Sequence, residues 1–325
     1  MSSQSKSSLL STFLKGIAMG AADVVPGVSG GTIAFITGIY ETLITTIDKL
    51  DFGLFKHIKK EGIKSAWAHY NLSFLTVLLL GIATSIISLA KLITYLLTNH
   101  PVLVWAFFFG LIIASIIFII KQIDRWNLVA IAGLIIAAIL SYWITIVPPL
   151  THGQPLWFLF IAGFIAIIAM ILPGLSGAFI LLLLGAYEIV IGSINGVIEG
   201  ITGADSSLLG TSALQLAVFA IGAIAGLKTF SKVLRWMFDH YKNTTLAVLT
   251  GFMIGALNKV WPWKEVLSFR TNHNGEQVPL LEKSVLPSQF DGDPMLLLAI
   301  GCAIFGCILI LGFEWYANRK KTTAV

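Results

Sequence analysis

A stretch of sixteen residues with the makings of an anion-binding site occurs twice in this chain. The first copy reads Pro26-Gly27-Val28-Ser29-Gly30-Gly31 and continues through Gly38 to Tyr40-Glu41; the second reads Pro173-Gly174-Leu175-Ser176-Gly177-Ala178 and continues through Gly185 to Tyr187-Glu188. The copies lie 147 residues apart without a gap, and eight of the sixteen positions are identical. Average residue usage would give about one or two identities. If the flanking segments cross a membrane, such a matched pair of interrupted segments is the best indicator of a substrate site.

The residue types in each copy suit a broken helix whose second half binds an anion. Pro26 and Gly27 would end and reverse the incoming helix, as Pro173 and Gly174 would in the second copy. The serines are good N-caps for the outgoing helix, and the glycines leave backbone N–H groups accessible at its positive dipole end. We therefore expect a phosphate between two converging tips, formed by Ser29, Gly30, Gly31, Thr32, Ser176 and Gly177. The alternative is that these small residues only permit close helix packing.

Three acids near the tips are candidates for carrying a proton or cation during transport. Glu41 and Glu188 each lie 12 residues past a tip serine, about 18 Å along a continuous outgoing helix. An acid at such a depth in a membrane is costly and therefore a functional candidate, although an interfacial acid paired with Tyr or Lys is equally consistent. Asp23 has no acidic counterpart, because Met170 takes its place, and it could accept a proton or cap a backbone amide.

Lys91 is a candidate for supplying positive charge to the head group of a phosphate. It matches Lys232 across the repeat but, unlike Lys232, lies outside any basic cluster. Snorkelling of the side chain to the surface is the alternative.

The segments that must position these residues are those of a membrane protein. Hydrophobic residues make up 57% of the 325 residues, charged residues 11%, and the mean hydropathy is +0.89. Six apolar runs are long enough to cross a hydrocarbon core of about 30 Å. These are Leu72–Leu97, Pro101–Ile120, Leu128–Val147, Ser212–Leu234, Thr245–Trp261 and Met295–Tyr316.

The net charge of +5 reflects membrane topology rather than nucleic-acid binding. Sixteen of the 21 Lys and Arg residues lie in five short segments, at 6–15, 49–64, 121–125, 228–242 and 319–321, whereas the intervening segments carry acids. This positive-inside pattern makes both termini cytoplasmic and predicts no nucleic-acid partner. No cluster of His, Cys and carboxylates has metal-ligand spacing, so we expect no metal or other cofactor.

The charge pattern and the repeat together predict an all-α polytopic protein built from two inverted repeats. Each repeat, at about 1–150 and 151–325 of a single membrane domain, would hold one Pro-Gly-broken hairpin, re-entrant or short, and three transmembrane helices. An odd number of crossings in each repeat inverts the second, as in many transporters. Residues 262–294 are polar and are expected to form an extracytoplasmic loop.

The first block also resembles a known family. Ala22-Asp23-Val24-Val25-Pro26-Gly27-Val28-Ser29-Gly30-Gly31-Thr32, followed by Gly38-Ile39-Tyr40-Glu41, is similar to the signature of the PopT-type polyprenyl-phosphate translocases of bacteria. The second block departs from the first at Ala178 and Phe179. The resemblance implies a plasma-membrane flippase that returns undecaprenyl phosphate from the outer to the cytoplasmic leaflet for cell-wall synthesis. Its partners would be that lipid carrier and membrane lipids; the sequence leaves the oligomeric state open.

Two other functions are consistent with the same motifs. One is an integral-membrane polyprenyl-pyrophosphate phosphatase, but such an enzyme needs Arg beside the tip serine and a nearby proton donor. Here Gly30 and Gly177 follow the serines, so no catalytic residue is expected. The other is a carrier or channel for a small soluble anion, which the tips would suit equally well.

Overall fold

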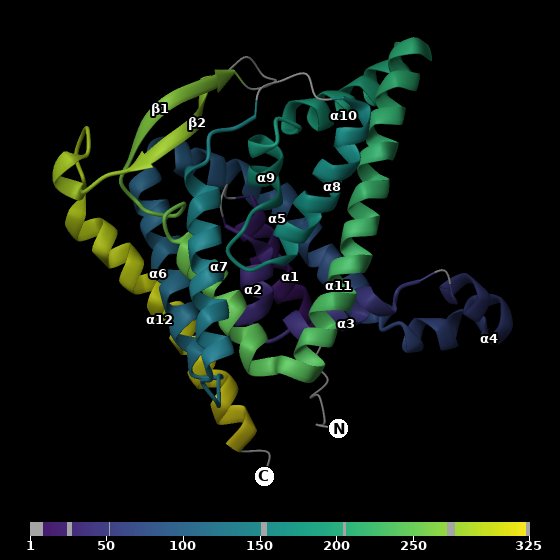
Figure 1. The fold of residues 1–325 in the computed structure, drawn as a ribbon, viewed down its shortest axis with the longest axis horizontal. Helices are drawn as coiled ribbons and strands as arrows, with labels where there is room; N and C mark the ends of the chain where they lie inside the picture. Colours follow the sequence, from purple (N-terminus) through teal and green to yellow (C-terminus); the bar gives the residue numbers. More distant parts are fainter. Residues whose placement is uncertain are drawn as a thin grey trace.

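The computed structural model describes residues 9–24, 28–51, 53–150, 155–203, 206–271 and 277–322, which form a helical bundle with one small β-hairpin at its end (Figure 1). The helices are α1 (Leu9–Asp23), α2 (Gly30–Ile36), α3 (Tyr40–Lys49), α4 (Gly53–His69), α5 (Leu72–Asn99), α6 (Pro101–Ile120), α7 (Leu128–Ile146), α8 (Leu156–Ile171), α9 (Gly177–Leu183), α10 (Tyr187–Thr202), α11 (Ser206–Ala256) and α12 (Leu296–Thr322).

Several helices are long and apolar enough to cross a membrane, which confirms a polytopic membrane protein. Among the described residues, four helices pass on length and hydropathy, and a fifth crossing results if the bent pair α9 and α10 counts as one span. Shorter apolar helices cover Leu156–Ile171 and Leu296–Gly312. The predicted spans Leu72–Leu97, Pro101–Ile120 and Leu128–Val147 correspond closely to α5, α6 and α7.

Two predicted spans, Ser212–Leu234 and Thr245–Trp261, lie on either side of a break within α11. The helix is interrupted at Tyr241, whose φ of −136° and ψ of 47° are not helical. Before this kink α11 packs on α8, where Gly222 and Gly226 lie against Phe160 and Phe164. Beyond it the helix packs on α7, where Gly251 and Gly255 face the carbonyl oxygens of Leu134 and Ala138. The sequence pattern, which ends one span before Tyr241 and begins the next after it, therefore placed this interruption correctly.

The outgoing halves of both broken segments are also interrupted, which corrects the expectation of one continuous helix from each tip. The short helices α2 and α9 end in Schellman motifs, a common way for a helix to stop at glycine. Gly38 and Gly185 adopt the positive φ values that these motifs need, 71° and 65°. The chain bends by 107° between α9 and α10. Glu41 and Glu188 therefore lie in the first turn of new helices, α3 and α10, rather than far along a straight arm.

Glycines hold the principal helix pairs at close approach. Gly81 of α5 faces the carbonyl oxygen of Phe13 in α1, and Gly222 of α11 faces that of Phe160 in α8. A Cβ atom at either glycine would collide with that oxygen, so only glycine allows these backbones to meet. Such small-residue contacts provide the van der Waals packing that holds membrane helices together.

Part of the segment 262–294 is a β-hairpin, so the fold is mostly helical rather than all-α as expected. Strand β1 (Lys264–Thr271) pairs antiparallel with β2 (Gln277–Ser284), and a 3₁₀ turn, η1 (Pro287–Gln289), follows. Along β1, Lys264, Val266, Ser268 and Arg270 are less exposed than the residues between them. This two-residue period is the sequence signal of a half-buried strand. The hairpin lies at one end of the bundle, and the C-terminal end of α12 lies at the other (Figure 1).

Candidate functional site

The two repeated tips meet inside the bundle. Thr32 Oγ1, in the first turn of α2, accepts a 2.9 Å hydrogen bond from the backbone N–H of Gly174 in the second tip. Ser29 Oγ donates to the carbonyl oxygen of Met170 over 3.1 Å, and Tyr40 Oη donates to that of Ile171 over 3.0 Å. The convergence of the two tips, which the sequence predicted, is therefore present in the fold. Pro26 and Gly27 lie outside the described residues.

The predicted N-caps are confirmed at both tips. Ser29 Oγ accepts a 3.1 Å hydrogen bond from the N–H of Gly31, and Ser176 Oγ accepts one of 3.4 Å from the N–H of Phe179. Both serines have β-region backbone angles, as N-caps require. Gly31 has a further role, because a Cβ there would lie 2.7 Å from the carbonyl oxygen of Ile171. Glycine at this position lets the second tip pack against the first.

The first tip already holds an anion, the side chain of Asp23. Its Oδ1 accepts a 2.6 Å hydrogen bond from the N–H of Gly30, so of the two roles open to Asp23 the amide cap is the one the fold uses. A Cβ at Gly30 would lie 2.6 Å from Asp23 Oδ2, so glycine is needed for this carboxylate to fit. Ser29 and Thr32 are 1% and 0% exposed. The N–H of Gly30, which was expected to face a phosphate, is thus bonded to Asp23, and both Gly30 and Gly31 are buried.

The second tip is open by comparison. Met170 occupies the position seven residues before Gly177 that Asp23 occupies before Gly30, and among the described residues no carboxylate caps this helix start. Gly177 is half-buried and Ala178 is exposed, whereas Gly30 and Gly31 are buried. Pro173 and Gly174 are buried, and Gly174 packs against Met253 and Ala256 of α11 with a φ of 92°. The second tip is therefore less enclosed than the first at Gly177 and Ala178, whereas Ser176 is buried.

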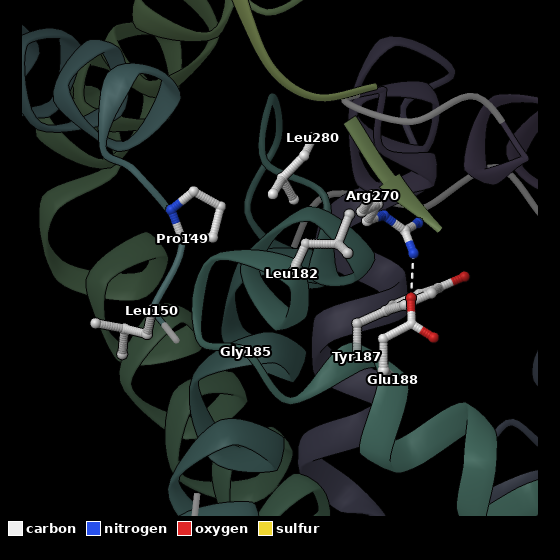
Figure 2. Close-up of a pocket in the computed structure, with 8 residues that line it drawn as sticks. All are labelled: Pro149, Leu150, Leu182, Gly185, Tyr187, Glu188, Arg270 and Leu280. Carbon is white, nitrogen blue, oxygen red and sulfur yellow. Dashed lines mark hydrogen bonds and ion pairs between the residues drawn. The ribbon is translucent and has the colours of Figure 1, made fainter. Parts of the chain in front are cut away.

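The two repeat-related glutamates differ in their surroundings. Glu41 is exposed in the first turn of α3. Glu188 is paired with Arg270, an inward-facing residue of β1, and the guanidinium of Arg270 also lies 5.1 Å from the ring of Tyr187. Figure 2 shows this ion pair closing one side of a pocket. The pocket is otherwise mainly apolar, and its lining residues are Pro149, Leu150, Leu182, Gly185, Tyr187, Glu188, Arg270 and Leu280.

The cations near the second tip are not the one expected from the sequence. Lys91 is exposed on α5, and none of the contacts of the described residues joins it to a tip. Lys259, which follows α11, instead has its Nζ 4.6 Å from the ring centroid of Phe179 in α9. Lys264, at the start of β1, is also enclosed, with a side chain only 7% exposed. The two-residue period of β1 was the signal that could have indicated an inward-facing Lys264.

Comparison with known proteins identifies relatives over nearly the whole chain. Residues 19–278 match a family described as VCA0040-like, undecaprenyl phosphate translocase-like. A protein of Vibrio cholerae named polyprenyl-phosphate transporter is 47% identical over 315 residues, covering 95% of this chain and 97% of the relative. A Staphylococcus aureus protein of the same name is 34% identical over 267 residues, covering 77% of this chain and 85% of the relative. No solved structure matches the chain.

Proposed function

Because the chain belongs to the undecaprenyl phosphate translocase-like family, and is therefore a transporter rather than an enzyme, we propose that it carries polyprenyl phosphate between the leaflets of its membrane. The lipid would be undecaprenyl phosphate, moved from the outer to the cytoplasmic leaflet of the bacterial plasma membrane for reuse in wall-polymer synthesis. The relatives named polyprenyl-phosphate transporter support the lipid class. The clustering of basic residues supports cytoplasmic termini.

The observation that carries this proposal is the meeting of two duplicated, serine-capped helix starts through Thr32 and Gly174. Backbone N–H groups at a helix start favour phosphate, and discontinuous helices that meet within a bundle form the substrate sites of many transporters. We assign the phosphate to the second tip, at Ser176 and Gly177, because Asp23 already caps the first. Ser29, Gly30, Gly31 and Thr32 then form the wall against which the second tip is held.

The equivalent packing of the two halves supports inverted repeats around this site. Gly16 faces the carbonyl oxygen of Leu78 between α1 and α5, and Gly163 faces that of Phe219 between α8 and α11. Gly16 and Gly163 are 147 residues apart, which is the offset of the two tips. Leu78 and Phe219 are 141 residues apart, which is the offset between the matching residues Lys91 and Lys232. We propose that the halves rock about the tips, so that the head group is reached from one leaflet and then from the other.

Coupling to a proton would involve Asp23, Glu188 or Glu41. Protonation of Asp23 would weaken its charge-assisted bond to Gly30 and so loosen the first tip. Protonation of Glu188 would release Arg270 and with it the contact between the β-hairpin and α10. Glu41 is the weakest of the three candidates, since it is exposed at the start of α3.

The test is a leaflet assay with the purified chain in vesicles. Polyprenyl phosphate added to the outer leaflet should become inaccessible to an external phosphatase, and Ser176→Leu should abolish this movement while the protein remains folded and inserted. Ser88→Leu is the matched control, because Ser88 is exposed and bonds only within its own helix, to the carbonyl oxygen of Thr84. Vesicle uptake of inorganic phosphate without lipid movement would instead identify a carrier for a soluble anion.

A further inference from the structure

A cluster of buried charges lies where α11 meets the β-hairpin. Lys259 Nζ is 2.9 Å from Glu282 Oε2, and Lys264 Nζ is 3.6 Å from the same oxygen. The three side chains are only 15%, 7% and 18% exposed for Lys259, Lys264 and Glu282. Two lysine amino groups thus share one carboxylate oxygen, and when both are protonated the cluster carries one excess positive charge.

Lys264 is the less satisfied of the two cations. Its Nζ lies 3.6 Å from the ring centroid of Trp105 on α6, and among the described residues it has no hydrogen-bond acceptor. An ammonium has three N–H donors, and a buried donor without an acceptor loses its hydration without compensation. Burial, together with the charge of Lys259, lowers the pKa of Lys264 from 10.5 to about 7, although Glu282 opposes this. A second anion beside Glu282 would relieve the deficit.

The cluster borders the open tip of the second repeat. The ring of Phe179, which lies 4.6 Å from Lys259 Nζ, belongs to the first turn of α9, and its backbone N–H is bonded to Ser176. Gly174 of the same tip packs against Met253 and Ala256, shortly before Lys259 in the chain. The two ammoniums contact Trp105 of α6, Phe179 of α9 and Glu282 of β2. Among the described residues, Glu282 is therefore the one acid that contacts them.

We propose that Lys259 and Lys264 form a phosphate-binding site on the hairpin side of the second tip. The inference rests on the proposed function and names the cations that receive the phosphate group of the substrate. Glu282 keeps the two ammoniums together when no substrate is bound. The oxygens of the incoming phosphate then accept hydrogen bonds from the lysine N–H groups that Glu282 leaves without an acceptor. Two cations and free donors suit a phosphate monoester, either on a lipid or as the free ion.

Binding to the purified full-length chain in lipid nanodiscs tests the proposal. The ligands are undecaprenyl phosphate, the alcohol undecaprenol and inorganic phosphate. Lys259→Met and Lys264→Met should each weaken undecaprenyl phosphate binding about tenfold or more, the loss expected for a charge-assisted hydrogen bond. Lys283→Met, an exposed lysine next to Glu282 on β2, is the control and should change affinity less than about twofold.

Glu282→Gln separates binding from a merely structural role. It should raise the affinity for undecaprenyl phosphate, because the carboxylate that competes for both ammoniums is gone, and the ligand should give a larger thermal stabilisation than in the wild type. Lys264→Arg should retain binding if Lys264→Met loses it through charge. Competition by inorganic phosphate would mean that the site recognises the phosphate group alone, whereas binding of the lipid without such competition would mean that the site requires a lipid phosphate.

Wild-type affinity in both Lys→Met variants, or equal binding of undecaprenol, would overturn the proposed site. Lipid movement between leaflets by those same variants would leave the proposed function standing. Conversely, lysine-dependent binding of inorganic phosphate by a wild-type chain that moves no lipid would retain the site and refute lipid transport.

Discussion

The side chain of Thr32 and the backbone N–H of Gly174, which are 142 residues apart, are joined by a buried hydrogen bond of 2.9 Å. This bond ties the first turn of α2 to the reversal of the second tip. Together with the bond from Ser29 to Met170, it makes the two duplicated segments one unit. The two tips in this unit differ, because the carboxylate of Asp23 caps the start of α2, whereas among the described residues no carboxylate caps the start of α9.

Replacing Thr32 by Val should loosen the two tips. The N–H of Gly174 would be left buried without an acceptor, which costs about 1–3 kcal/mol of stability. Thermal unfolding of the purified variant measures this loss, and lipid movement should slow as well. Thr84→Val is the control, since the exposed Thr84 bonds only to the carbonyl oxygen of Leu80 in its own helix. Equal unfolding temperatures for the two variants would contradict the coupling.

Placing an acid at Met170 should block the second tip as Asp23 blocks the first. Met170 is 47% exposed and lies seven residues before Gly177, so the side chain of Met170→Asp can reach the start of α9 without disturbing the core. Binding of polyprenyl phosphate should fall by about tenfold or more, as for a like charge held against an anion. Met170→Asn offers nearly the same shape without the charge, and it should bind almost normally. Undiminished binding by the Asp variant would exclude the second tip as the phosphate site.

Glu188→Gln should have a larger effect than Glu41→Gln, although the two acids occupy equivalent positions. Glu188 neutralises Arg270, a largely buried cation whose Nε is without a hydrogen-bond partner among the described residues, whereas Glu41 is exposed. We expect a loss of about 1–3 kcal/mol for Glu188→Gln and less than about 0.5 kcal/mol for Glu41→Gln, by thermal unfolding. The dependence of transport on pH tests whether either glutamate carries a proton. If both variants keep the wild-type pH profile, a proton role for Glu41 and Glu188 is excluded.

The stability of the protein should rise with pH above neutrality through Lys264. Its pKa is about 7 in the folded chain and 10.5 when unperturbed, so between these values the unfolded chain binds more protons than the folded one. Unfolding temperature followed from about pH 7 to about pH 10 should therefore increase in the wild type and in Lys283→Met, and this increase should be reduced in Lys264→Met. Identical slopes in all three proteins would show that Lys264 titrates normally.

Alanine at Gly38 should destabilise the break between α2 and α3. Gly38 has a φ of 71° and open space where a Cβ would lie. The cost is therefore that of the left-handed backbone alone, about 1–2 kcal/mol.

Gly210→Ala is the opposite case, because Gly210 lies within α11, also beside open space. Alanine there should add up to about 1 kcal/mol of stability. Chemical unfolding of both variants measures these opposite changes in the free energy of unfolding. A more stable Gly38→Ala would mean that the break between α2 and α3 is not required.

Local features of the fold could be predicted from the sequence because each depends on residues close together in the chain. Apolar runs such as Pro101–Ile120 and Leu128–Val147 set the helices within one or two residues, and Ser29 and Ser176 indicated the N-caps that they form. The gapless repeat indicated two related tips. The predictions were weaker where the local pattern is ambiguous: the turns at Gly38 and Gly185 were read as continuous helix.

The sequence by itself therefore determined a polytopic membrane transporter with two serine-capped, glycine-rich tips. Only the tertiary structure decided that Asp23 closes one tip and that Glu188 pairs with Arg270. It also decided that Lys259 rather than Lys91 borders the other tip, and that Lys264 shares Glu282 with Lys259. The physical reason is that capping and helix length are governed by neighbours along the chain. The charge and accessibility of a site depend instead on which distant side chains packing brings to it, and here the β-hairpin brings both Arg270 and Lys264.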